Sequence, residues 1–195
     1  MNYYKIASDL NPHFYNFELS NEQGMSELFD NNIFFKRSFP INQWIKPEMH
    51  LFEELEEYLP IENGEVIKPN IWSNIMHVWG SNTFVFSQEL TIALLEDLKN
   101  CGAFLEANYE SQTWFFYYCS THISGAINFD SSEYDMFDDG TIMTLHKPVL
   151  FKSKIEGYDA FRLIEYDSFL FVSEKIKNII EKYFVGEVFT PISII

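Results

Sequence analysis

Two stretches of this chain share one layout, and together they decide the fold. The first contains Phe84-Val85-Phe86-Ser87, then Leu90, Ile92, Leu94, Leu95 and Leu98, and then Gly102 before Phe104-Leu105. The second contains Phe169-Leu170-Phe171-Val172-Ser173, then Ile176, Ile179, Ile180 and Tyr183, and then Gly186 before Val188-Phe189. Each pattern predicts a short apolar strand, a serine N-cap, an amphipathic helix, a glycine that stops the helix, and another strand.

The segments around these two units predict more strands. We expect an opening strand at 3–7, a loop-rich region at 8–32, a turn at Asn63-Gly64 and an antiparallel hairpin formed by 160–164 and 169–172. Further strands are expected at 33–35, 103–109, 112–121, 141–145, 149–151 and 192–195. Because strands gather around a few helices without regular alternation, the sequence predicts an α+β fold with a mainly antiparallel, twisted sheet.

A third helix is expected from Pro47 to Leu59. Proline suits the first turn of a helix, and Pro60 follows the expected end. Met49, Phe52, Leu55 and Leu59 are spaced three or four residues apart and would form one apolar face. The opposite face would carry four glutamates at positions 53, 54, 56 and 57.

The 195 residues fit a single domain, with a possible N-terminal lobe at 1–82 and a second part at 83–195. Apolar residues make up 47% of the chain, enough for a sizeable core rich in phenylalanine and tyrosine. The N-terminus does not resemble a signal peptide, and no apolar run is long enough to span a bilayer. Cys101 and Cys119 are expected to be buried thiols, which favours a reducing, cytoplasmic location.

The formal net charge of −16 limits the classes of partner. Such a charge repels phosphate backbones and anionic membranes, so we expect no nucleic-acid or membrane partner. It attracts basic protein surfaces, although solubility alone can also explain an acidic composition.

Motifs that would indicate catalysis or a cofactor are absent from the sequence. There is no phosphate-binding loop, dinucleotide-binding glycine pattern, zinc-protease motif or nucleophile elbow. The histidines have no metal-ligand spacing, and the acids between 127 and 140 do not follow the calcium-loop pattern. We therefore predict no catalytic residue, no metal and no cofactor.

The second half of the chain resembles a family of immunity proteins from bacterial polymorphic-toxin systems, the eleventh in the numbered series and formerly a domain of unknown function. The resemblance covers about residues 84–195. It is carried in order by Val85-Phe86-Ser87, Ile127-Asn128-Phe129-Asp130-Ser131-Ser132, Phe161-Arg162-Leu163, Phe171-Val172-Ser173 and Gly186-Glu187-Val188-Phe189. These positions are caps, glycines and core residues, so the resemblance transfers no functional site.

The resemblance implies a protein that binds and neutralises a cognate protein toxin without catalysis. A basic toxin would associate faster with an acidic inhibitor, so two acid-rich segments are candidate contact surfaces, each with aromatic residues as anchors. Their residues are Glu53, Glu54, Glu56, Glu57 and Tyr58 in the expected helix, and Asp130, Glu133, Tyr134, Asp135, Phe137, Asp138 and Asp139 in an expected loop. Two alternatives remain open: an acidic scaffold or nucleic-acid-mimicking regulator, and a hydrolase that uses clustered carboxylates.

Overall fold

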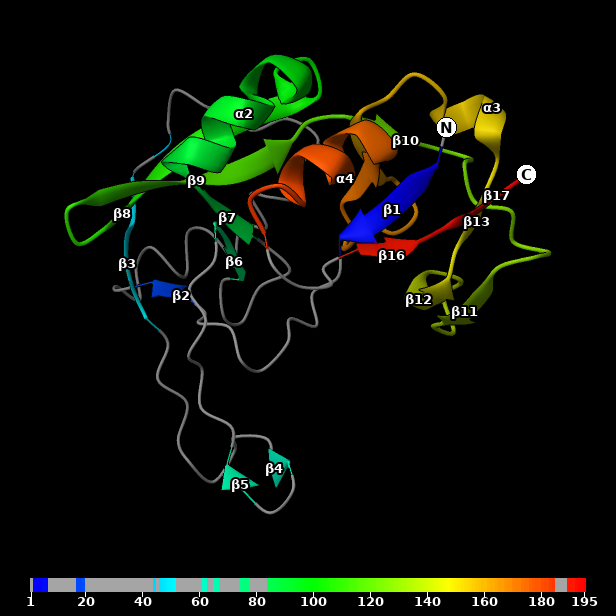
Figure 1. Cartoon of the computed structure of the whole chain (residues 1–195). Helices are drawn as coiled ribbons and strands as arrows, with labels where there is room; N and C mark the ends of the chain where they lie inside the picture. Colours follow the sequence, from blue (N-terminus) through cyan, green and yellow to red (C-terminus); the bar gives the residue numbers. More distant parts are fainter. Residues whose placement is uncertain are drawn as a thin grey trace.

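The computed structural model describes residues 2–6, 17–19, 44, 46–51, 61–62, 65–66, 74–77, 84–184 and 189–195 (Figure 1). Helices and strands are not regularly alternated along the chain, and the two largest sheets are mixed but mainly antiparallel. The predicted α+β class is therefore confirmed.

The larger sheet has six strands in the order β2-β3-β8-β9-β7-β6. Only β3 and β8 run parallel, and the other neighbours are antiparallel. Strands β8 and β9 form its longest hairpin. The bounds are β2 Phe17–Leu19, β3 Glu48–Leu51, β6 Ile75–His77, β7 Phe84–Ser87, β8 Gly102–Tyr109 and β9 Gln112–Cys119.

The second sheet has five strands in the order β10-β14-β15-β1-β16. Its first pair is parallel and the remaining pairs are antiparallel. The bounds are β1 Tyr3–Ile6, β10 His122–Ile123, β14 Ala160–Leu163, β15 Phe171–Ser173 and β16 Phe189–Pro191. Strand β1, near the start of the chain, lies between β15 and β16 from its other end.

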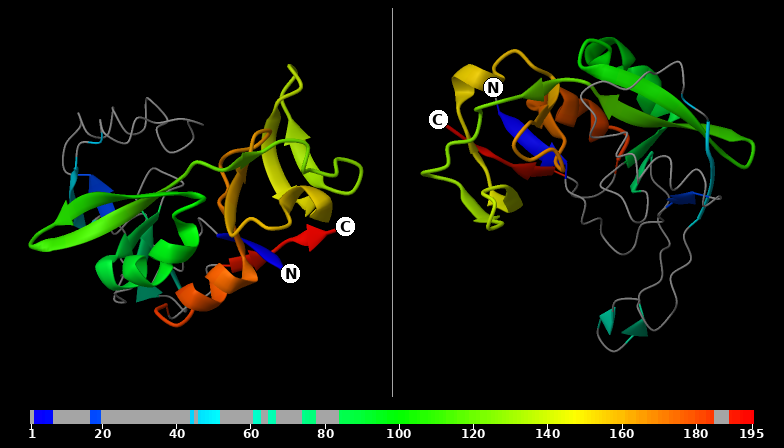
Figure 2. Two further views of the ribbon diagram at one scale, coloured as in Figure 1. Left: turned by 90° about the horizontal axis from the view of Figure 1, so that it is seen from above. Right: turned by 180° about the vertical axis from the view of Figure 1, so that it is seen from behind.

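Three small pairs and three helices complete the described part of the chain. The pairs are β4 Ile61–Glu62 with β5 Glu65–Val66, β11 Glu133–Met136 with β12 Ile142–Lys147, and β13 Val149–Leu150 with β17 Ser193–Ile194. The helices are α2 Gln88–Leu98, α3 Lys152–Ile155 and α4 Glu174–Ile180. Helices α2 and α4 pack against each other across the junction of the two main sheets (Figures 1 and 2).

The two units predicted from the sequence have the same topology. In each, the second strand of an antiparallel pair ends in serine, a helix follows, and the next strand returns to the same sheet beyond one intervening strand. The spatial orders are β6-β7-β9-β8 and β14-β15-β1-β16. This is a split β-α-β arrangement. The intervening strand is β9 in the first unit, and in the second it is supplied by the N-terminus.

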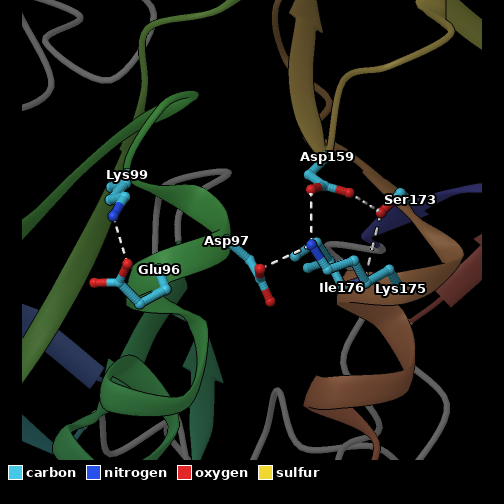
Figure 3. A network of polar contacts seen from close by, with 7 residues as sticks. All are labelled: Glu96, Asp97, Lys99, Asp159, Ser173, Lys175 and Ile176. Atoms are coloured by element: carbon cyan, nitrogen blue, oxygen red, sulfur yellow. Dashed lines mark hydrogen bonds and ion pairs between the residues drawn. The ribbon is translucent and has the colours of Figure 1, made fainter.

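The two serine caps also have the same hydrogen bonds. The Ser87 hydroxyl accepts from the Leu90 N–H at 3.3 Å and donates to Asn74 Oδ1 at 2.6 Å. The Ser173 hydroxyl accepts from the Ile176 N–H at 3.4 Å and donates to Asp159 Oδ1 at 2.7 Å (Figure 3). Each serine N–H also donates to the backbone carbonyl of the same partner. The predicted caps are confirmed, and their partners Asn74 and Asp159 were not predicted from the sequence.

A lysine joins the two units close to the second cap. Lys175 Nζ lies 2.7 Å from Asp97 Oδ1 on α2 and 3.2 Å from Asp159 Oδ2 (Figure 3). The hydrogen bond with Asp97 is the main reason why the pKa of Lys175 is raised. The side chain is half exposed, so this bridge orients the helices more than it stabilises them.

Three buried clusters fill the space around the sheets. The first lies between the helices and both sheets and includes Leu90, Leu94, Leu98, Ile176 and Ile180. The second covers the other face of the larger sheet, where alternate β9 residues Trp114, Phe116 and Tyr118 meet Met49 and Val85. The third covers the other face of the second sheet and contains Tyr3, Phe161, Phe171 and Leu145.

The expected helix at 47–59 is wrong at its start, because Glu48–Leu51 is strand β3. Its backbone pairs with β2 on one side and β8 on the other, and Met49 is buried in the second cluster. These distant partners override the local helical spacing. Residues 52–60 lie outside the described residues, as do 33–35 and Gly186.

Gly102 does not stop the helix. Helix α2 ends at Leu98, and Gly102 is the first residue of β8. A Cβ atom there would overlap the backbone carbonyl oxygen of Tyr118 and lie 2.9 Å from the Tyr117 hydroxyl. Glycine is needed because two strands approach closely, not because the helix requires a left-handed residue.

Several other expectations need smaller corrections. Residues 17–19 of the expected loop form β2, and the closing strand is divided between β16 and β17, which join different sheets. Ile92 and Leu95 on α2 are 67% and 45% exposed instead of packed. The opening strand and the 160–172 hairpin are confirmed. Asn63 and Gly64 lie outside the described residues, and the short strands β4 and β5 pair on either side of them.

Candidate partner-binding surface

The structure describes only one of the two acid-rich segments that the sequence predicts as contact surfaces. Glu53, Glu54, Glu56, Glu57 and Tyr58 lie outside the described residues. Their role as a contact surface stays a prediction. All seven residues of the second segment lie within the described part of the chain.

The expected acidic loop is mostly a β-hairpin. Glu133–Met136 forms β11 and pairs antiparallel with β12, with Tyr134 opposite Leu145. Tyr134 is half-buried against the third cluster, while Glu133 and Asp135 point to solvent. The acidic segment therefore contains a strand, β11, and its inward-facing Tyr134 attaches that strand to the core. The hairpin lies on the face of the second sheet opposite α4 (Figures 1 and 2).

Two of the five acids have basic partners on the neighbouring strand. Glu133 Oε1 lies 2.8 Å from Lys147 Nζ, and Asp135 Oδ2 lies 2.8 Å from His146 Nε2. All four side chains are at least half exposed, so each pair contributes about 1 kcal/mol or less to stability. Lys147 offsets the charge of Glu133, whereas His146 offsets that of Asp135 only when its imidazole is protonated.

A tight turn holds the tip of the hairpin. The Phe137 N–H donates to the Thr141 carbonyl at 2.9 Å, and the Gly140 N–H donates to the Phe137 carbonyl at 3.0 Å. Gly140 has φ 86°, which glycine adopts without strain. Asp139 Oδ1 accepts from the Thr141 N–H at 2.9 Å and from its hydroxyl at 2.7 Å. These bonds lower the pKa of Asp139, which therefore acts as a turn-forming residue.

Asp130 and Asp138 are the remaining two acids of this segment. Both are exposed, and neither forms an ion pair or side-chain hydrogen bond with another residue in the described part of the chain. No described residue offsets either charge, so both remain available to a partner.

Exposed apolar side chains accompany these charges. Phe129 is 40% exposed, Met136 46%, Phe137 54% and Met143 46%, and together they are four of the nine exposed large apolar side chains in the described residues. Phe129 packs edge-on against Tyr134, with ring centroids 5.4 Å apart. Sequence reasoning selected Phe137 but missed the two methionines and Phe129. Met136, Phe137 and Met143 are exposed because the hairpin has few neighbours among the described residues, which no local pattern reveals.

Buried reactive groups in the described residues are poorly suited to chemistry. Cys101 and Cys119 are free and buried, and burial raises the pKa of the Cys119 thiol to about 11. A neutral, enclosed thiol is a poor nucleophile. Arg162 is 2% exposed and donates to the Asp167 carbonyl at 2.6 Å, which ties the β14–β15 connection to the core.

No protein-family model matches the chain, and no curated protein is significantly similar to it. Among the described residues, no group of three or more His, Cys, Asp or Glu side chains is placed to hold a metal ion. In the same part of the chain, no helix combines the length and apolar character needed to cross a bilayer.

Proposed function

We propose that this chain is an immunity protein that binds a cognate bacterial toxin and neutralises it by contact, without turnover. One observation carries the proposal: the exposed hairpin and the residues just before it combine two carboxylates that have no ionic partner among the described residues with four apolar side chains that are 40–54% exposed. The ordered resemblance over about residues 84–195 supports the same class of protein. The proposal includes a cytoplasmic location, where the toxin would meet its inhibitor.

The electrostatics favour a basic toxin. A chain with a formal charge of −16 attracts a positively charged protein over distances near the Debye length, about 10 Å at 0.1 M salt. Such attraction raises the association rate more than the final affinity. Exposed carboxylates on a projecting hairpin suit contact better than catalysis, which needs acids converging on one reacting atom.

The test is binding and protection against the product of the toxin gene encoded immediately upstream. Co-expression of the full chain with that product should restore growth, and the purified proteins should form a complex. The association rate should fall by about tenfold or more from low salt to 0.5 M salt, because added ions screen the attraction.

A matched pair of variants tests where the charge acts. Asp130→Asn with Asp138→Asn removes two charges from the acidic segment that contains the hairpin, and Glu89→Gln with Glu96→Gln removes two from α2 on the other sheet. We expect the hairpin variant to associate several-fold more slowly than the helix variant. If the wild-type chain neither bound the toxin nor restored growth, the proposal itself would be contradicted.

A further inference from the structure

From the geometry of the hairpin tip we infer, on the basis of the proposed function, that Met136, Phe137, Asp138 and Met143 form the anchor of the interface. The partner that fits them is a basic protein with an apolar pocket bordered by lysine or arginine. The four residues are called the tip below. Within this anchor the apolar side chains set the residence time of the complex, whereas Asp138 sets the association rate.

The apolar side chains of the tip are more exposed to solvent than most large apolar side chains in the described residues. Phe137 is 54% exposed, and Met136 and Met143 are each 46% exposed, within eight residues of one another in sequence. Aromatic residues and methionine are enriched in the cores of protein interfaces. Clustered exposure of this kind marks interaction sites more often than isolated apolar residues do.

The tip is already held in one conformation. The Phe137 N–H and carbonyl both bond across the turn, and Asp139 closes it through Thr141. Lower down, Tyr134 and Leu145 attach the hairpin to the third cluster. A preformed anchor loses little conformational entropy on binding, so more of its contact energy appears as affinity.

The charge distribution selects the partner. Lys147 and His146 partner Glu133 and Asp135 at the base, whereas Asp138 at the tip has no ionic partner among the described residues. A partner pocket that accepts Phe137 must therefore place Asp138 at its rim, where positive side chains favour it and negative ones repel it. This arrangement excludes an acidic protein or an anionic membrane as the occupant.

The tip can be compared with an equally exposed apolar site on α2. Ile92 is 67% exposed and lies on a helix on the other sheet, and its neighbour Leu95 is 45% exposed. Truncating Ile92 removes a similar exposed surface without touching the hairpin. Glu96 provides the matching control for charge, because it lies on α2, away from the hairpin, and is paired with Lys99.

The experiment measures binding kinetics of the full chain with the purified product of the adjacent toxin gene. Phe137→Ala should raise the dissociation rate by about 30-fold and leave the association rate within about twofold, as expected for a buried anchor. Met143→Ala should act in the same direction by about fivefold. Asp138→Asn should lower the association rate several-fold at low salt, and the difference should vanish at high salt.

The controls separate the inference from the proposed function. Ile92→Ala and Glu96→Gln should both bind within about twofold of wild type, with all variants sharing the wild-type thermal midpoint. If the wild type binds but Phe137→Ala and Met143→Ala behave like Ile92→Ala, the tip is not the anchor, although the immunity function stands. If the wild type does not bind at all, both the proposed function and the inference fail.

Discussion

Replacing Ser173 with alanine should destabilise the protein more than replacing Ser87, although both serines cap helices in equivalent units. Each substitution removes an N-cap, which costs about 1 kcal/mol. Ser173 is fully buried and also donates to a carboxylate, Asp159, at 2.7 Å. Loss of a hydrogen bond to a charged group costs about 2 kcal/mol, which gives about 3 kcal/mol for Ser173→Ala.

The corresponding loss at Ser87 is smaller, because its partner Asn74 is neutral and the serine is only half-buried. A neutral hydrogen bond contributes about 1 kcal/mol, so Ser87→Ala should cost about 2 kcal/mol. Because a small domain has about 5–15 kcal/mol of total stability, both losses are measurable by urea unfolding with an unchanged slope.

A double-mutant cycle with Asp159→Asn isolates the charged part of the interaction. Ser173→Ala should cost about 1 kcal/mol less in the Asp159→Asn background than in the wild type, since the carboxylate is then absent. An equal cost in both backgrounds would refute the reasoning, as would a larger loss for Ser87→Ala than for Ser173→Ala.

Further predictions concern glycines and alkaline pH. Gly102→Ala should lower the free energy of unfolding in urea by about 3 kcal/mol, because the new Cβ overlaps the Tyr118 carbonyl oxygen. Gly125 has φ 62° and open space around it, so Gly125→Ala should cost about 1–2 kcal/mol from backbone strain alone. Equal losses for the two variants would contradict this account. Burial raises the pKa of the Cys119 thiol from 9.0 to about 11 and also raises that of Tyr117, so the unfolded chain releases these protons first. The urea midpoint should therefore fall as pH rises from about 9 to about 11, and Cys119→Ala should reduce the fall. A midpoint that stays constant over this range would show that neither buried group is linked to unfolding.

Local sequence signals predicted the parts of the fold that depend on neighbouring residues. Ser87 and Ser173 could be recognised as caps because the N–H that each one accepts lies three residues further on. Their partners Asn74 and Asp159 could not be recognised, because the pairing of separate strands brings each partner next to its serine. The same reason explains the error at Glu48–Leu51, where pairing with β8 decides the structure.

The candidate surface was predictable in composition but not in geometry. The density of acids between 127 and 140 was visible, and so was Phe137 as a possible anchor. Which acids are neutralised depends on the cross-strand register that places Lys147 opposite Glu133. Exposure of Met136 and Met143 depends on how little of the fold covers the hairpin, which only the assembled structure reveals.

Stoichiometric titration of the adjacent gene's product with the purified chain tests the central claim most directly. Toxin activity should fall in proportion to the amount of chain added and reach zero near one chain per toxin, since a binding protein acts only while bound. Complete inactivation by a small fraction of an equivalent would contradict the account and indicate turnover. Undiminished activity at an excess of the chain would contradict it equally.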